Sequence, residues 1–377
     1  MSENKNKDIK KKKNIKDKTS INPTLEDFKK EVYFKGSIPN KKKETVKKEK
    51  NEEILDEKEV KNKINIIILL IIIFVLLILV ILFYLSYSFN NMFFNSKTNK
   101  DNFFNKPLNQ IPNYNKKAGE SNFGDINWLA KVYYKEDYTK TSDNVNIHSY
   151  IIENPTNTNT WIILAHGYNS EGLYMTDISK YLYKMGYNVL ILDFRGHGYS
   201  SDNTVSMGYL ERLDIIAWVN YINKNYDNTK IILYGYGMGA NASLLAAGNS
   251  YLSNVVGIIS DTAFTSLNDE INYQLKNVYN LPYSPIIMIS NLLNKKDNKY
   301  SINDVSPINI VKNIKVPILF IHGSNDTLIP KNMTEELYNK TTIEKEIFII
   351  DNAKHSETPY IDQDKYFNKI KEFIQNK

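Results

Sequence analysis

The hydrophobic positions of this chain form one long unbroken run and, well after it, a series of short runs. Each short run has seven to nine residues rich in Ile, Val and Leu, and a mixed apolar and polar stretch of helix length follows most of them. Uninterrupted apolar runs of this length are typical of parallel strands buried on both faces of a sheet. The predicted strands are 161–167, 188–196, 230–237, 255–261, 316–323 and 345–351.

Residues 128–377 therefore read as one folded domain in which strands and helices alternate. Two further strands, 128–140 and 144–153, precede the series around a polar turn. We predict an α/β fold with a doubly wound, mostly parallel sheet in about 250 residues, a size that one such domain fills. The alternation breaks between residues 265 and 310 into two helix-like pieces. We expect a small helical cap there, over the carboxyl ends of the strands, where open α/β sheets bind ligands.

The long apolar run, residues 66–85, contains twenty residues without a charge. At 1.5 Å per residue it forms about 30 Å of helix, the thickness of the hydrocarbon core of a bilayer. We predict one transmembrane helix over residues 64–86, so the lipid bilayer is a partner through residues 66–85. A cleaved signal peptide fits less well, because 63 residues precede the span.

The charged residues that bear on domain organisation lie mainly before this helix. Residues 1–63 hold 20 of the 48 basic residues and 13 of the 42 acidic ones, and a composition of this kind predicts a disordered, Lys-rich tail. The twenty residues before the span hold six lysines, against two in the twenty after it. The positive-inside bias then predicts a cytoplasmic tail, a juxtamembrane tether over 87–127 and a C-terminal domain outside the plasma membrane.

Composition also excludes several classes of protein. The chain has no Cys, which excludes a disulfide scaffold, a thiolate metal site and a cysteine nucleophile. It has only two Arg, the residue with the bidentate fork that suits phosphate, so we predict no nucleic-acid partner. No two histidines stand four residues apart beside a carboxylate, as in a helical metal site, and no complete dinucleotide fingerprint is present. We predict neither a metal nor another cofactor.

The candidate chemistry lies just after the predicted strands. Residues 235–239, Gly-Tyr-Gly-Met-Gly, stand between a strand and a helix in the pattern of a nucleophile elbow, G-x-nucleophile-x-G, and we call this segment the elbow. Asp326 and His355 each follow a later strand, and the order elbow, acid, histidine is that of a hydrolase. The backbone N–H groups near Tyr168, together with that of Met238, are candidates to face a carbonyl oxygen.

These stretches resemble the α/β-hydrolase superfamily, and most closely its membrane-anchored bacterial members of the serine-aminopeptidase and esterase type. The matching stretches are AHGYNSEG, LDFRGHGYS, MGYLERLDIIAWV, LYGYGMGA, SDTAFTS, FIHGSNDTLIP and DNAKHSE. The resemblance implies Asp326 as the triad acid, His355 as the triad base, and Tyr168 with Met238 as the oxyanion donors. Asp261, which also ends a strand, is a second candidate for the acid.

The sequence departs from this family at the nucleophile, where Gly237 stands in place of Ser. Glycine has no hydroxyl for His355 to deprotonate, so no acyl-enzyme forms. Three hypotheses follow: a degenerate hydrolase that binds a ligand or partner, an enzyme in which His355 and Asp326 act without a serine, and an ordinary hydrolase that lost its serine in this copy. Tyrosines of the cap region (Tyr273, Tyr279 and Tyr283) favour an acyl ester, amide or peptide-like ligand.

Overall fold

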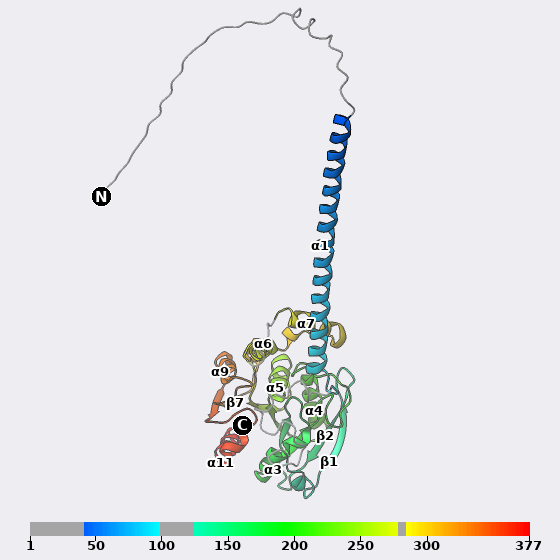
Figure 1. The fold of residues 1–377 in the computed structure, drawn as a ribbon. Coiled ribbons are helices and arrows are strands. Elements are labelled where there is room, and N and C mark those ends of the chain that lie inside the picture. The colour runs from blue at the N-terminus through cyan, green and yellow to red at the C-terminus, as the bar shows by residue number, and fades with distance from the viewer. Residues whose placement is uncertain (1–40, 99–123, 278–283) are drawn as a thin grey trace, which may run out of the picture. The chain divides into compact units, whose positions relative to one another are not determined.

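The computed structural model describes residues 41–98, 124–277 and 284–377 (Figure 1). The chain divides into two units, residues 1–75 and residues 76–377. In the first unit the described residues belong to helix α1 (Lys41–Phe94), which continues into the second. The second unit contains the sheet and all later helices.

The second unit is built on one eight-stranded sheet in the order β1-β2-β4-β3-β5-β6-β7-β8. The pairs β1–β2 and β2–β4 are antiparallel, and every other neighbouring pair is parallel. The predicted mostly parallel α/β sheet is thus confirmed. The strands are β1 (Lys135–Lys140), β2 (Asn146–Ile152), β3 (Thr160–Ala165), β4 (Asn188–Leu192), β5 (Lys230–Tyr236), β6 (Val255–Asp261), β7 (Ile318–Gly323) and β8 (Lys345–Ile350).

Helices cover both faces of the sheet, as the unbroken apolar strands require. Successive strand residues alternate between two cores: Ile163 and Leu233 pack on one face, Ile162 and Ile232 on the other. The first core includes residues of α4, α5 and α9, and the second includes residues of α3 and α11. The bounds of these helices are α3 (Thr176–Lys184), α4 (Glu211–Asn225), α5 (Met238–Asn249), α9 (Lys331–Lys340) and α11 (Gln363–Gln375).

The region between β6 and β7 contains the two expected helices, α6 (Leu267–Asn277) and α7 (Ile286–Asn298). Three short elements follow: η4 (Ile302–Asp304), α8 (Pro307–Ile310) and η5 (Val311–Asn313). The other short helices are α2 (Ile126–Leu129), η3 (Gly172–Met175) and α10 (Thr358–Ile361). Trp128 lies in α2, so the first strand begins seven residues later than predicted, because the side chain of Asp125 accepts the N–H of Trp128 and caps a helical turn.

Helix α1 is longer than the predicted span of residues 64–86 at both ends. Before the span, the helix runs through residues 41–63, where a disordered tail was expected; Lys and Glu are good helix formers, and Lys63 pairs with Glu59 one turn earlier. After the span it continues to Phe94, inside the expected tether, and Phe89, Met92 and Phe94 are buried in the first core. Residues 1–40 and 99–123, the rest of the tail and most of the tether, lie outside the described residues.

Candidate active site at the carboxyl ends of the strands

The elbow has the geometry that its sequence predicts. Strand β5 ends at Tyr236, and α5 begins at Met238, so Gly237 alone forms the turn. Its backbone has φ +54° and ψ −112°, a conformation that residues with a Cβ rarely adopt. The Gly237 N–H donates to the carbonyl of Asp261, and its own carbonyl accepts the N–H of Asn241, which starts the helix. The turn is therefore held from both sides.

The flanking glycines are required by close packing. A Cβ on Gly235 would lie 2.2 Å from the carbonyl oxygen of Gly239, and a Cβ on Gly239 would lie 2.1 Å from that of Ala165. Both contacts are with backbone atoms, so no side chain can move aside to relieve them.

The position between these glycines is open. Among the described residues, and apart from the two adjacent in the chain, a Cβ built on Gly237 would have one neighbour within 4 Å, the Cα of Gly167 at 3.9 Å. The elbow therefore has room for a side chain at the point where a nucleophile would project. The backbone conformation of residue 237 favours glycine, but the surrounding space would also accommodate a residue with a side chain.

Asp326 and His355, the predicted acid and base, lie together. Asp326 follows β7 and His355 follows β8, and the two strands are parallel neighbours, so both residues emerge at the same edge of the sheet. His355 Nδ1 is 2.8 Å from Asp326 Oδ2. Tyr236 connects the pair to the elbow, because it directly precedes Gly237 and its ring centroid is 6.4 Å from that of His355.

The electrostatics of this pair favour the charged form of both groups. Burial opposes a charge on His355, but the adjacent Asp326 carboxylate outweighs this effect and raises the pKa of His355. Burial likewise disfavours the Asp326 carboxylate, but His355 and the N–H of Ile329 hold the pKa of Asp326 below its ordinary value. The side chain of His355 is 15% exposed, so it is mostly but not completely buried.

These shifts predict how the stability of the fold depends on pH. The raised pKa of His355 gives a stabilisation that is complete below its ordinary value of 6.5 and is lost as pH rises through the raised value. The lowered pKa of Asp326 gives a stabilisation that is present above 3.8 and is lost only at more acidic pH. We expect the native protein to have a higher Tm than His355→Gln. The difference in Tm should be largest between pH 4.5 and 6 and should be a few degrees smaller at pH 9. A margin that widens toward pH 9 would contradict the pairing.

His322 supports the acid loop, a role that the sequence analysis missed. It lies in β7, is buried, and its Nε2 is 2.9 Å from the carbonyl oxygen of Ile329 and 3.6 Å from Asp326 Oδ2. Asp326 Oδ1 in turn accepts the N–H groups of Leu328 and Ile329 at 2.9 Å. His322 thus fixes the loop that presents Asp326. The sequence feature that could have indicated this role is the position of His322 four residues before Asp326, in the segment HGSND.

Asp261, the second candidate for the acid, is engaged elsewhere. Thr358 and Tyr366 donate hydroxyls to its Oδ2, and Thr262 donates to its Oδ1. Burial raises the pKa of Asp261 to about 6, although these hydroxyls oppose the shift. His355 donates its Nδ1–H to Asp326, whereas Asp261 accepts from Thr358 and Tyr366 and so anchors the segment that follows His355.

The two expected oxyanion donors flank the elbow. Met238 is the first residue of α5, and the first N–H groups of a helix have no acceptor within it. Tyr168 follows Gly167, whose Cα is the nearest atom to the open side of Gly237. The Tyr168 side chain turns toward α1: its hydroxyl donates to the Met92 carbonyl at 3.2 Å, and its ring stacks with Phe93 at 6.5 Å.

The two serines nearest the elbow in sequence and register, Ser243 and Ser260, do not face His355. The Ser243 hydroxyl is buried and donates back to the carbonyl of Gly239, one turn earlier in α5. Ser260 is buried in β6, where it pairs in register with Gly235 of the elbow strand. Across the described part of the chain, the hydrogen bond of the His355 ring is the one to Asp326, so its Nε2 faces no hydroxyl.

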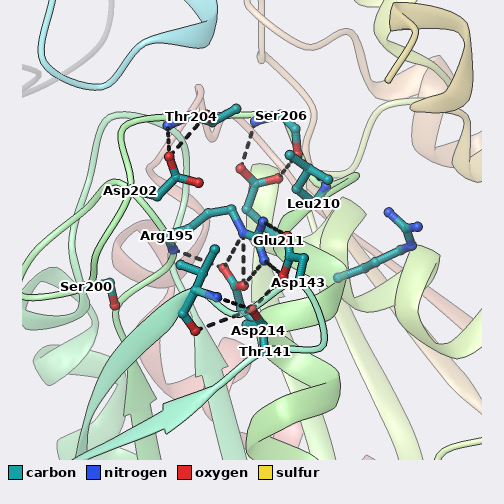
Figure 2. A network of polar contacts seen from close by, with 12 residues as sticks. Thr141, Asp143, Arg195, Ser200, Asp202, Thr204, Ser206, Leu210, Glu211 and Asp214 are labelled. Carbon is teal, nitrogen blue, oxygen red and sulfur yellow. Dashed lines mark hydrogen bonds and ion pairs between the residues drawn. The ribbon is translucent and has the colours of Figure 1, made fainter. Parts of the chain in front are cut away.

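A buried ionic network holds the loop after β4 beside this edge (Figure 2). The side chain of Arg195 is 1% exposed and lies between two carboxylates. It donates to Asp214 on α4 through Nε and Nη2, and to Asp143 of the β1–β2 turn through Nη1 and Nη2. Asp214 therefore pairs with Arg195, whereas Arg212 stacks over the ring of Tyr209.

Comparisons with known proteins agree with this architecture. The family model described as "Serine aminopeptidase, S33" matches residues 156–306, which include the elbow. The model described as "Serine hydrolase (FSH1)" matches residues 271–359, which include the Asp326–His355 pair. The chain is 32% identical to the protein YqkD of Bacillus subtilis (strain 168) over 223 residues, which cover 59% of this chain and 73% of YqkD.

Three further similarities bear on the anchor and the fold. The yeast membrane protein YNL320W of Saccharomyces cerevisiae is 24% identical over 63% of this chain and 78% of its own length. An esterase of Pyrococcus furiosus superposes with a TM-score of 0.55 at 25% identity, over 66% of this chain and 93% of the esterase. The hydrolase GrgF of Penicillium sp. sh18 superposes with a TM-score of 0.53 at 15% identity, over 65% of this chain and 99% of GrgF, and supports the fold alone.

Proposed function

Because the chain belongs to the α/β-hydrolase superfamily and has glycine at the tip of its elbow, we propose that it is a degenerate, membrane-anchored serine hydrolase. In this proposal Asp326 and His355 remain from the triad, and the protein binds a ligand or partner that it does not cleave. The observation that carries the proposal is the open space beside Gly237: among the described residues other than its two chain neighbours, no side chain comes within 4 Å of a Cβ built there. His355 keeps its hydrogen bond to Asp326, but no hydroxyl of the described residues is hydrogen-bonded to its ring.

Without a serine hydroxyl at position 237, the site can form no acyl-enzyme, but its oxyanion hole and ligand-binding groups remain. A serine hydrolase forms its acyl-enzyme through the serine hydroxyl, which the histidine deprotonates. Without the serine, an oxyanion hole and binding groups still give roughly 10³–10⁴-fold acceleration over water in a well-built site. An acceleration of this size is too small for an efficient hydrolase.

The ligand that fits these features contains a carbonyl group, as in an acyl ester, an amide or a peptide-like molecule. The N–H groups of Tyr168 and Met238 would receive its carbonyl oxygen. Tyr273 on α6 packs against the first core and would contribute an aromatic wall. The other two cap tyrosines, Tyr279 and Tyr283, lie outside the described residues.

The anchor supports a location at a membrane. Among the described residues, α1 is the one helix that is long and apolar enough to cross a bilayer by length and composition. The excess of lysines before the apolar run of α1 favours a cytoplasmic N-terminus and a C-terminal α/β domain outside the plasma membrane. Labelling of Tyr251→Cys by a membrane-impermeant maleimide on intact cells tests this orientation, because the native chain has no Cys. The proposed orientation predicts that the variant is labelled.

Hydrolysis of short-chain acyl esters by the native full chain tests the proposal. We expect the native protein and His355→Ala to hydrolyse p-nitrophenyl butyrate at the same low rate, because the imidazole has no nucleophile to activate. A native rate that His355→Ala abolishes would refute the binding role.

The same result would favour the second candidate, a serine-independent enzyme in which His355 activates water. The retained Asp326–His355 hydrogen bond and the partial exposure of His355 support this candidate. Only the neutral imidazole accepts a proton, so its rate would rise as pH increases through the raised pKa of His355.

A further inference from the structure

One face of α1 is covered by the globular domain as far as the end of the apolar run. Ser86 directly follows the run and is fully buried, and Leu82, one turn earlier, is already half-buried. Leu85 and Tyr87, on other sides of the helix, remain exposed. The domain therefore begins where the apolar segment ends, with no spacer between them.

Helix α7 is one of the elements at this junction, and it lies beside the last turns of α1 (Figure 1). The Ser290 hydroxyl of α7 donates to Asn90 Oδ1 at 3.1 Å, and both side chains are buried. Asn90 lies five residues beyond Leu85, about 7–8 Å along the helix axis. The polar layer of a bilayer extends about 5–8 Å beyond its hydrocarbon core on each side. With residues 66–85 of α1 in the hydrocarbon core, the contact of α7 with Asn90 would therefore be at the depth of the headgroups.

The outer face of α7 has the character of a helix that lies on a membrane. Met288 and Leu292 stand four residues apart on one side, and each is 63% exposed. Ser290 and Asn294 face the interior. The end of the helix adds three exposed lysines against one aspartate (Lys295, Lys296 and Lys299; Asp297). Exposed apolar side chains next to lysines are the pattern of interfacial helices that bind anionic lipid surfaces.

We propose that the outer face of α7 is a second membrane contact, in which Met288 and Leu292 enter the boundary between headgroups and acyl chains of the bilayer that α1 spans. Continuity with the apolar run of α1 identifies the bilayer as the occupant of this face. The contact would hold the cap at the lipid surface. It depends on membrane insertion of α1, and it is independent of whether the elbow catalyses a reaction.

Fluorescence of a single labelled cysteine tests the contact, and the absence of Cys from the native chain makes the label site-specific. The full chain with Leu292→Cys carries the environment-sensitive dye NBD and is reconstituted into vesicles of phosphatidylcholine with phosphatidylglycerol. We expect a lipid with a nitroxide near the headgroup end of its acyl chain to lower the NBD emission by about half or more, and aqueous iodide to have little effect. Met288→Cys, on the same face, should behave in the same way.

Tyr251→Cys is the matched control. Tyr251 is 91% exposed and precedes β6, at the amino ends of the parallel strands, whereas α1 contacts Tyr168 at their carboxyl ends. Its label should be quenched by iodide and unaffected by the nitroxide lipid. Iodide quenching at 292 as strong as at 251 would overturn the proposal. Protection at 292 from both quenchers would indicate a second copy of the chain on this face and would overturn it equally.

Discussion

Gly237→Ser is expected to raise the esterase activity of the protein well above that of the native chain. The new hydroxyl would project into the open space of the elbow. The gain requires that it reach the ring of His355, whose centroid is 6.4 Å from that of Tyr236, the residue before position 237. Loss of a triad serine costs about 10⁶-fold in kcat in an optimised protease, so even a poorly tuned site should gain at least about 100-fold. Initial rates of p-nitrophenyl butyrate hydrolysis by the full chain in detergent measure the gain.

The matched control is Gly237→Ala, which adds a Cβ but no hydroxyl. Both variants force a residue with a Cβ into φ +54°, ψ −112°, so each should lose about 1–3 kcal/mol of stability, which lowers Tm by roughly 2–12 °C. Only the serine variant should gain activity, and His355→Ala in its background should abolish that gain. Equal esterase rates for the serine and alanine variants would show that the elbow and the Asp326–His355 pair do not form one site.

Asp214→Ala is expected to be the most destabilising single change in the buried network. It leaves the Arg195 guanidinium buried, with only Asp143, which is 37% exposed, as an ionic partner. Removal of one partner from a buried ion pair costs about 3–5 kcal/mol, because the remaining charge has lost its compensation. We expect Tm to fall by roughly 6–20 °C, as measured by circular dichroism of the full chain in detergent.

Lys331→Ala is the control for this change, because it breaks an ion pair with Glu335 that is almost half exposed on both sides. Exposed pairs of this kind contribute about 0–1 kcal/mol, so Tm should fall by no more than about 4 °C. An effect of Asp214→Ala as small as that of Lys331→Ala would mean that Arg195 is hydrated or paired otherwise than the network shows.

The fold could be predicted from the sequence because its signals are local. Apolar runs without polar interruption mark strands that helices cover on both faces, and the predicted strands match β3 to β8 within a few residues. The start of β1 was misplaced because one side chain, Asp125, caps a turn at Trp128. The length of α1 was underestimated because hydropathy marks only its apolar part, whereas its last turn is stabilised by packing in the domain core.

The site was only partly predictable for a related reason. The elbow, Asp326 and His355 occur in short motifs, and the parallel sheet brings their strand ends to one edge. The contacts of His322 with the acid loop and of Tyr168 with α1 join distant segments, and no local pattern encodes them. The pairing of Asp214 with Arg195, and not with Arg212, depends likewise on how the loop after β4 folds onto α4.

Without a hydroxyl at position 237, we expect this chain to form no covalent adduct with a fluorophosphonate, a probe that reacts with the activated serine of serine hydrolases. The native full chain and Gly237→Ser are incubated with the probe and analysed by intact and peptide mass spectrometry. The account predicts no adduct on the native protein and one adduct on the variant, at position 237. An adduct on a native serine that His355→Ala prevents would show that another hydroxyl serves as the nucleophile and would contradict the claim.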